Sequence, residues 1–240
     1  MGKLLKFEFA KLIKAKVFYI CLFVSIAIVF IFGLVADADS PSVNSLYFFK
    51  SFTEFSLITT VIAIPICIFV CEDAQCGAEK TVLGRGVSRS KFFFAKYISS
   101  LIAYMLFVLI TMAATYIFAI IKFNYYVDDT LVPFIFLVLL GLFMFHALFF
   151  AISTILGKNG FAIAMAILIP TILQLLMMLL EHVIDLENFS FQIFSFNDIL
   201  NTFVRYTEWN KDLTWSTVLS IVYPVLFIGA AHEVYVRKEN

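Results

Sequence analysis

The sequence predicts an all-α integral membrane protein with six transmembrane helices in one domain, residues 1–240. Its composition supports this fold class, because 62% of the residues are apolar and 14% are charged, whereas soluble chains have roughly half and roughly a quarter. Six apolar runs also reach the roughly 20 residues that a helix needs to cross about 30 Å of hydrocarbon. These runs lie at about 17–36, 51–71, 97–121, 131–156, 161–184 and 214–234.

An amphipathic helix is predicted before the first span, from Leu4 to Lys16. Apolar side chains gather on one side of this helix and lysines on the other: Leu5, Phe9, Leu12 and Ile13 against Lys3, Lys6, Lys11 and Lys14. Such a helix lies in the membrane interface, with its apolar side at the acyl boundary and its lysines among anionic lipid headgroups. A plain positively charged anchor would take the same position.

The basic residues predict the orientation of the chain. Five lysines precede the first span, five basic residues follow the second, and three more share their face: Lys158, Arg237 and Lys238. The opposite face holds the other four: Lys50, Lys122, Arg205 and Lys211. By the positive-inside rule, both termini are cytoplasmic in a bacterial cytoplasmic membrane. A cleavable signal peptide ending near Ala38 is the alternative, but the charge bias of the five later spans requires the first to stay in place.

The connection at residues 72–96 is the longest segment predicted on the cytoplasmic side, and we call it the elbow. After an acidic pair, it continues as a helix-forming stretch from Asp73 to Leu83 and breaks at Gly84–Gly86. Ser88 then caps the next helix. This pattern predicts a helix-turn-helix on which a partner docks. A merely solvated loop would explain the charges but not the structured pattern.

On the outer side, residues 185–213 alternate aromatic and polar residues. This alternation is typical of short amphipathic helices that dip into the membrane interface, with Tyr206, Trp209 and Trp215 at the level of the headgroups. We therefore predict short outer helices before the last span.

No catalytic or metal site is predicted. A phosphate-binding loop is absent, because Gly157-Lys158 is followed by Asn159 and not by a hydroxyl residue, so the chain does not hydrolyse ATP itself. The histidines show no metal-ligand spacing. The net charge of zero gives no indication of a nucleic-acid partner.

Four polar residues in or beside the spans are candidates for a substrate pathway: Glu54, His146, Gln174 and Glu181. Polar groups inside a membrane are functional hypotheses by default, although a histidine bonded to a Ser, Thr or Gln of a neighbouring helix is the common alternative. Ala162 and Ala166 have the small-x-x-x-small spacing that allows close helix contact, and we assign them to a dimer interface.

The elbow contains, in order, Glu72-Asp73, Gly77, Lys80-Thr81, the Gly84–Gly86 break, Ser88-Arg89 and Lys96. With these residues the elbow resembles the permease subunits of type-2 ATP-binding cassette (ABC) exporters. The six spans, the basic entry helix and the long outer segment extend the resemblance to nearly the whole chain.

The resemblance implies a coupling helix at Asp73 to Leu83 that sits in a groove of a separate ABC ATPase. The residues implied in coupling are Glu72, Asp73, Gly77, Lys80, Thr81, Gly84 and Arg89. ATP and Mg²⁺ would be bound by that ATPase, with no cofactor in this chain. Residues 185–213 would be re-entrant outer helices, and two permeases, identical or sister chains, would meet through their first and fifth spans.

Short members of this family resemble exporters that clear antimicrobial peptides such as lantibiotics from the membrane. An amphipathic peptide or a lipid-like molecule is therefore the substrate that the resemblance implies. The alternative is an ATP-independent carrier or channel, or a membrane-embedded enzyme. An enzyme requires convergent catalytic groups at one depth, and a carrier more often shows internal repeats, and the sequence shows neither pattern.

Overall fold

A computed structural model describes residues 2–35, 56–123, 131–184, 190–204 and 210–237. All regular elements in these residues are helices: α1 (Gly2–Lys14), α2 (Lys16–Val35), α4 (Ser56–Cys76), α5 (Ala78–Gly84), α6 (Arg89–Phe123), α7 (Leu131–Leu156), α8 (Asn159–Val183), the 3₁₀ helix η1 (Phe191–Phe194), α9 (Phe196–Val204) and α10 (Lys211–Arg237). Six of them, α2, α4, α6, α7, α8 and α10, are long and apolar enough to cross a membrane. The predicted all-α membrane fold with six spans is confirmed.

Two of the spanning helices extend the furthest beyond their predicted ends on the side of the elbow. α4 continues to Cys76 instead of ending at residue 71, and α6 begins at Arg89 instead of residue 97. The sequence estimate stops where apolar residues stop, but a helix satisfies its own backbone hydrogen bonds beyond the hydrocarbon. The added turns carry charged side chains that find partners in neighbouring helices, as shown below.

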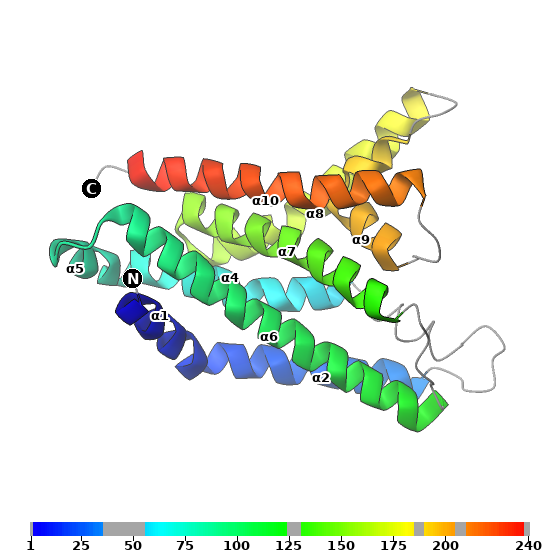
Figure 1. Cartoon of the computed structure of the whole chain (residues 1–240), viewed down its shortest axis with the longest axis horizontal. Helices are drawn as coiled ribbons and strands as arrows, with labels where there is room; N and C mark the ends of the chain where they lie inside the picture. The colour runs from blue at the N-terminus through cyan, green and yellow to red at the C-terminus, as the bar shows by residue number, and fades with distance from the viewer. Residues whose placement is uncertain (1, 36–55, 124–130, 185–189, 205–209, 238–240) are drawn as a thin grey trace.

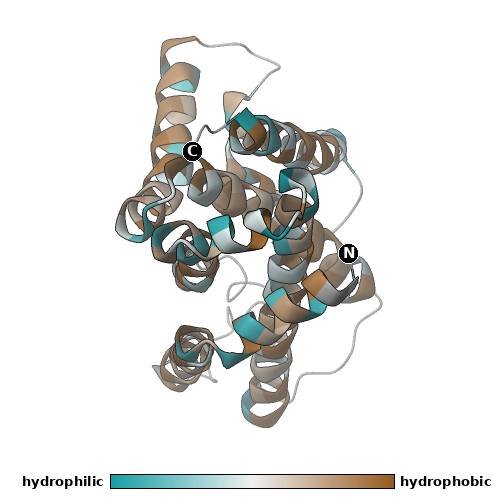
Figure 2. Cartoon of the chain, turned by 90° about the vertical axis from the view of Figure 1, so that its left-hand side faces the viewer, coloured by the Kyte–Doolittle hydropathy of each residue, from teal (hydrophilic) through white to brown (hydrophobic). Residues whose placement is uncertain are grey.

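Both chain ends lie at the same end of the molecule, beside α5 (Figure 1). Figure 2 looks at this end and shows hydrophilic residues gathered around α5 and the adjacent helix ends, while the long helices are mostly hydrophobic. An even number of crossings requires this arrangement. Which side of the membrane this end faces stays a prediction.

α7 is the central helix of the bundle. Within the chain, 72% of its most apolar stretch is buried, whereas the corresponding share is 22% for α2 and 11% for α8. α7 packs against α4, α8, α9 and α10, and it contributes the fully buried rings Phe134, Phe145 and Phe150. The C-terminal half of α8, in contrast, projects away from the other helices (Figure 1).

The predicted outer helices are present at residues 191–204, toward the end opposite the termini (Figure 1). α9 buries one face against α7 and α10, with residues spaced as one side of a helix: Phe196, Ile199, Leu200, Phe203 and Val204. The Tyr223 hydroxyl of α10 donates to the carbonyl of Phe194 over 3.1 Å. Tyr206 and Trp209 lie outside the described residues, and Trp215 is 48% exposed on α10.

Candidate functional site

Two glycines shape the elbow. Gly77 has φ +70° and Gly86 has φ +84°, a left-handed backbone that side chains disfavour, so the chain turns sharply before and after α5. The single helix predicted from Asp73 to Leu83 is therefore wrong, because Gly77 divides it. Glu72 and Asp73 belong to the last turns of α4, and the separate short helix is α5. The break at Gly84–Gly86 and the restart of the helix after Ser88 are confirmed.

α5 lies on the surface of the molecule. None of its residues is buried. Val82 and Leu83 rest partly buried on the hydrophobic core, while Lys80, Thr81 and the following Arg85 are exposed. The helix therefore presents a polar face outward and is attached to the body by its apolar face.

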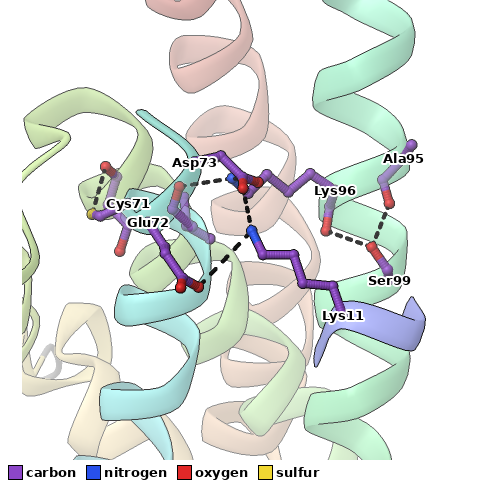
Figure 3. A network of polar contacts seen from close by, with 9 residues as sticks. Lys11, Cys71, Glu72, Asp73, Ala95, Lys96 and Ser99 are labelled. Carbon is purple, nitrogen blue, oxygen red and sulfur yellow. Dashed lines mark hydrogen bonds and ion pairs between the residues drawn. The ribbon is translucent and has the colours of Figure 1, made fainter. Parts of the chain in front are cut away.

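A cluster of charged side chains lies at the base of the elbow, and we call it the Asp73 cluster: Lys11 of α1, Glu72 and Asp73 of α4, and Lys96 of α6 (Figure 3). Lys96 Nζ donates to Asp73 Oδ2 over 2.7 Å and to the carbonyl of Val70 over 2.9 Å. Lys11 Nζ donates to Asp73 Oδ1, and it lies 3.9 Å from Glu72 Oε2. One carboxylate thus joins two ammonium groups from two other helices.

Asp73 and Lys96 are almost inaccessible to solvent, with 4% and 5% exposure. Ions in such a place are stable only when they are paired and hydrogen-bonded. The ring of Phe69 adds cation–π contacts, with its centroid 5.6 Å from Lys11 Nζ and 5.5 Å from Lys96 Nζ. The cluster therefore holds α1, α4 and α6 together where the elbow begins.

The structure shows which of the predicted coupling residues lie at the surface and which are buried. Asp73 is buried and paired inside the chain, so it does not form part of a docking surface, and its part in coupling stays a prediction. Glu72, with its side chain 47% exposed, and Lys80 and Thr81 do lie at the surface. Arg89 begins α6 and donates to the carbonyl of Val236 over 3.3 Å, so it links the elbow to α10.

Glu8 is a buried carboxylate on α1 close to the Asp73 cluster. It is 1% exposed, and its Oε2 has no hydrogen-bond partner among the described residues. Burial raises the pKa of Glu8, and the nearby Asp73 carboxylate raises it further, against the opposing effect of Lys96 and Lys11. The folded chain therefore holds a proton on Glu8 more tightly than the unfolded chain does.

Replacing Glu8 with glutamine is expected to stabilise the protein near neutral pH. In the unfolded chain Glu8 ionises at its ordinary pKa, and in the folded chain it ionises at a higher pH, so this group costs stability as the pH rises between the two values. The gain from Glu8→Gln should be larger at pH 8 than at pH 5. Thermal unfolding midpoints in detergent at these two pH values measure it, with the exposed Glu233→Gln as matched control. A Glu8→Gln variant that is less stable than the wild type at pH 8 would contradict the expectation.

The three predicted pathway residues that the structure describes each have a different hydrogen-bond partner. His146 of α7 is fully buried, and its Nε2 lies 3.1 Å from the Ser100 hydroxyl of α6. Gln174 Oε1 accepts a 2.8 Å hydrogen bond from Asn197 of α9, and Glu181 Oε1 accepts one of 3.0 Å from Ser190. His146 thus has the helix-to-helix partner of the structural alternative. Glu54 lies outside the described residues.

Ala162 and Ala166 lie inside the chain. They are 0% and 2% exposed and belong to the core, where α8 packs on α4 and α7. Their small size does allow close helix contact, as the spacing predicts, but that contact is within one chain. The assignment of these alanines to a dimer interface is therefore corrected. The exposed side of α8 carries larger apolar residues: Leu168, Ile172, Leu175, Leu176 and Leu179.

Sequence reasoning missed Lys11, Lys96 and Glu8 as members of one site. The sequence places Lys11 on the amphipathic entry helix and Lys96 in the elbow, but not as partners of one carboxylate, because Asp73 is 62 and 23 residues away from them in the chain. One signal was present, because Glu8 is the only acidic residue in the first 36 residues. An isolated acid among lysines on an amphipathic helix indicates a specific position.

Comparison with known proteins agrees with this architecture. Residues 4–176, well over half of the chain, match the model of the ABC-2 family transporter proteins. The match begins in α1, includes the whole elbow and the Asp73 cluster, and ends within α8. No curated protein is significantly similar to the chain in sequence. The family is one of membrane-embedded transport subunits that generally work with ABC ATPase subunits, and the chain belongs to it as a multi-pass membrane permease.

Proposed function

We propose that this chain is the permease of an ATP-driven exporter and that a separate ABC ATPase docks on α5. The observation that carries this proposal is the form of α5: a short helix with no buried residue, bounded by two left-handed glycines, at the end of the molecule that holds both termini. A short exposed polar helix of this kind is suited to seating in the groove of a partner. The ATPase binds ATP and Mg²⁺, and this chain supplies neither.

Through the Asp73 cluster, a displacement of α5 would be transmitted to the membrane-spanning helices. α5 is joined directly to α4 and, through a short turn, to α6. Asp73 connects both helices to α1 by its ion pairs with Lys11 and Lys96. A push on α5 therefore moves the inner ends of α1, α4 and α6 as one unit, because separating them would leave a buried charge unpaired.

The proposal includes a second permease chain, identical or a sister chain, that meets this one through α2 and α8. α8 buries the smallest share of its apolar stretch within the chain, 11%, and α2 and α10 follow with 22% each. Both termini and α5 would be cytoplasmic, in the bacterial cytoplasmic membrane. The substrate would be an amphipathic peptide, as in the lantibiotic-immunity branch of such exporters, or a lipid-like molecule.

The docking proposal is tested by purifying the chain from its native membrane in mild detergent. We expect an ABC ATPase to co-purify and to be identified by mass spectrometry. Changing Lys80 and Arg85 to glutamate should reduce the ATPase recovered at least tenfold, which corresponds to about 1.4 kcal/mol of binding free energy. Lys211→Glu, the same change at an exposed lysine on α10, is the matched control.

Two results would count against the proposal. Unchanged recovery of the ATPase with the Lys80 and Arg85 variant would show that α5 is not the docking helix. Absence of any ABC ATPase from the purified sample, together with transport by the chain alone in liposomes, would contradict ATP-driven export.

A further inference from the structure

A pocket of about 160 Å³ opens between α1, α2, α4 and α6. Its walls are mostly apolar and include Phe18, Ile66 and Phe107. The surfaces of α2 and α6 beside it expose large apolar residues, among them Phe23 and Leu106. The pocket therefore borders the surface that faces lipid chains in a membrane.

The mouth of the pocket is cationic. It lies where the interfacial helix α1 ends and α2 begins, and it is lined there by Lys11 and Lys16. Glu72 also lines the mouth, but it lies 3.9 Å from Lys11, whose ammonium is already bound to Asp73, so these charges offset each other. Lys16 is exposed and has no ion-pair partner within the described part of the chain. One lysine thus remains available to an anion.

The inner part of the pocket contains polar groups. Ser100 and Tyr104 of α6 line it, and Tyr104 is 1% exposed with a hydroxyl that has no hydrogen-bond partner among the described residues. A buried hydroxyl without a partner is rare, because it has lost its bonds to water. Since helix side chains tilt toward the N-terminal end, the Tyr104 side chain leans toward the level of the mouth. An acceptor on a bound molecule would satisfy it.

We propose that this pocket binds one anionic glycerophospholipid from the leaflet on the side of the termini. Its phosphate lies at Lys16, an ester carbonyl accepts the Tyr104 hydroxyl, and one acyl chain runs along the apolar walls. The pocket offers a cation, then a hydroxyl donor, then apolar walls. A glycerophospholipid presents its phosphate, its ester carbonyl and its acyl chain in the same order. The site is one for a resident lipid and does not depend on ATP-driven export.

The test measures lipid binding by native mass spectrometry on the full-length purified chain. The probes are phosphatidylglycerol, which is anionic, and phosphatidylcholine, which is not, with identical acyl chains. We expect one phosphatidylglycerol per chain to bind more tightly than phosphatidylcholine. Equal binding of the two lipids by the wild type would overturn the proposal.

Two variants keep the test specific. Lys16→Gln should weaken phosphatidylglycerol binding about fivefold and phosphatidylcholine binding less, because the choline cation already offsets the phosphate charge. Lys6→Gln, the same change at an exposed lysine of α1 that does not line the pocket, should have no effect. An equal loss with both variants, or no loss with either, would overturn the proposal.

Tyr104→Phe tests the inner part of the pocket. Because the hydroxyl has no partner, its removal should not lower the unfolding temperature of the lipid-free chain. It should weaken the binding of both lipids several-fold, since both carry ester carbonyls. Unchanged lipid binding with this variant would overturn the assignment of the ester group to Tyr104.

Discussion

Asp73→Ala is expected to lower the free energy of unfolding by about 3–5 kcal/mol, the usual cost of removing one partner from a buried ion pair. The change leaves Lys96, which is 5% exposed, without a counter-ion and with the Val70 carbonyl as its hydrogen-bond acceptor, and it frees Lys11 from its ion pair with Asp73. We expect the inner ends of α1, α4 and α6 to separate. The measurement is the fraction of monodisperse protein in detergent after heating over a range of temperatures.

Glu72→Ala is the matched control for Asp73→Ala. Glu72 is the adjacent carboxylate, but its side chain is 47% exposed and 3.9 Å from Lys11, so its loss should cost no more than about 1 kcal/mol. Adding Lys96→Met to Asp73→Ala should restore part of the stability, because it removes the unpaired buried charge. Equal effects of Asp73→Ala and Glu72→Ala would contradict the structural role of the cluster.

This prediction also affects how docking experiments are interpreted. A variant of Asp73 that no longer binds an ATPase has lost the arrangement of three helices, and its failure to bind does not identify a contact. Variants of exposed residues on α5, such as Lys80, distinguish the loss of a direct contact with the ATPase from the loss of helix packing.

Phe203→Ala is expected to destabilise the outer part of the molecule by about 3–5 kcal/mol, as for other buried phenylalanines. Phe203 is 0% exposed and packs against α7 at Gly141, where a Cβ atom would lie 3.1 Å from the ring. Truncation leaves a cavity between α9 and α7 that Gly141 has no side chain to fill. We expect α9 to detach while the spans stay inserted.

Limited proteolysis in detergent measures this effect, because a detached α9 exposes new cleavage sites near residues 196–204. Asn201→Ala, on the half-buried side of the same helix, is the control and should behave as the wild type within about 0.5 kcal/mol. A Phe203→Ala chain that resists proteolysis as well as the control would show that α9 is held by other contacts.

The spans were predictable because membrane crossing is a local requirement. A run of apolar residues long enough for the hydrocarbon must be a helix, whatever its neighbours are. α9 was predictable for a similar reason, since its alternating aromatic residues already indicate one buried side. The ends of α4 and α6 were not, because their added turns are held by the pair between Asp73 and Lys96.

The candidate site was only partly predictable. The glycines and charges of the elbow identified the segment, but not that Gly77 would end α4 or that Asp73 would face inward. For Ala162 and Ala166, the spacing indicated a close helix contact but not which helix provides it. For His146, the partner Ser100 is 46 residues away, and no pattern in the sequence links them.

The sequence by itself determined that this chain lives in a membrane, how many times it crosses and which segment joins the second and third spans. These properties depend on the transfer of each segment from water to lipid, which is a sum over neighbouring residues. The tertiary structure alone decided which charges are internal and which are available to a partner. A lysine near the interface has the same sequence context whether it binds a lipid phosphate, as proposed for Lys16, or a buried carboxylate, as Lys96 does. Only the packing of α1, α4 and α6 distinguishes the two lysines. Packing removes water from the Lys96 ammonium, which therefore needs the Asp73 carboxylate, and it leaves the Lys16 ammonium exposed to solvent.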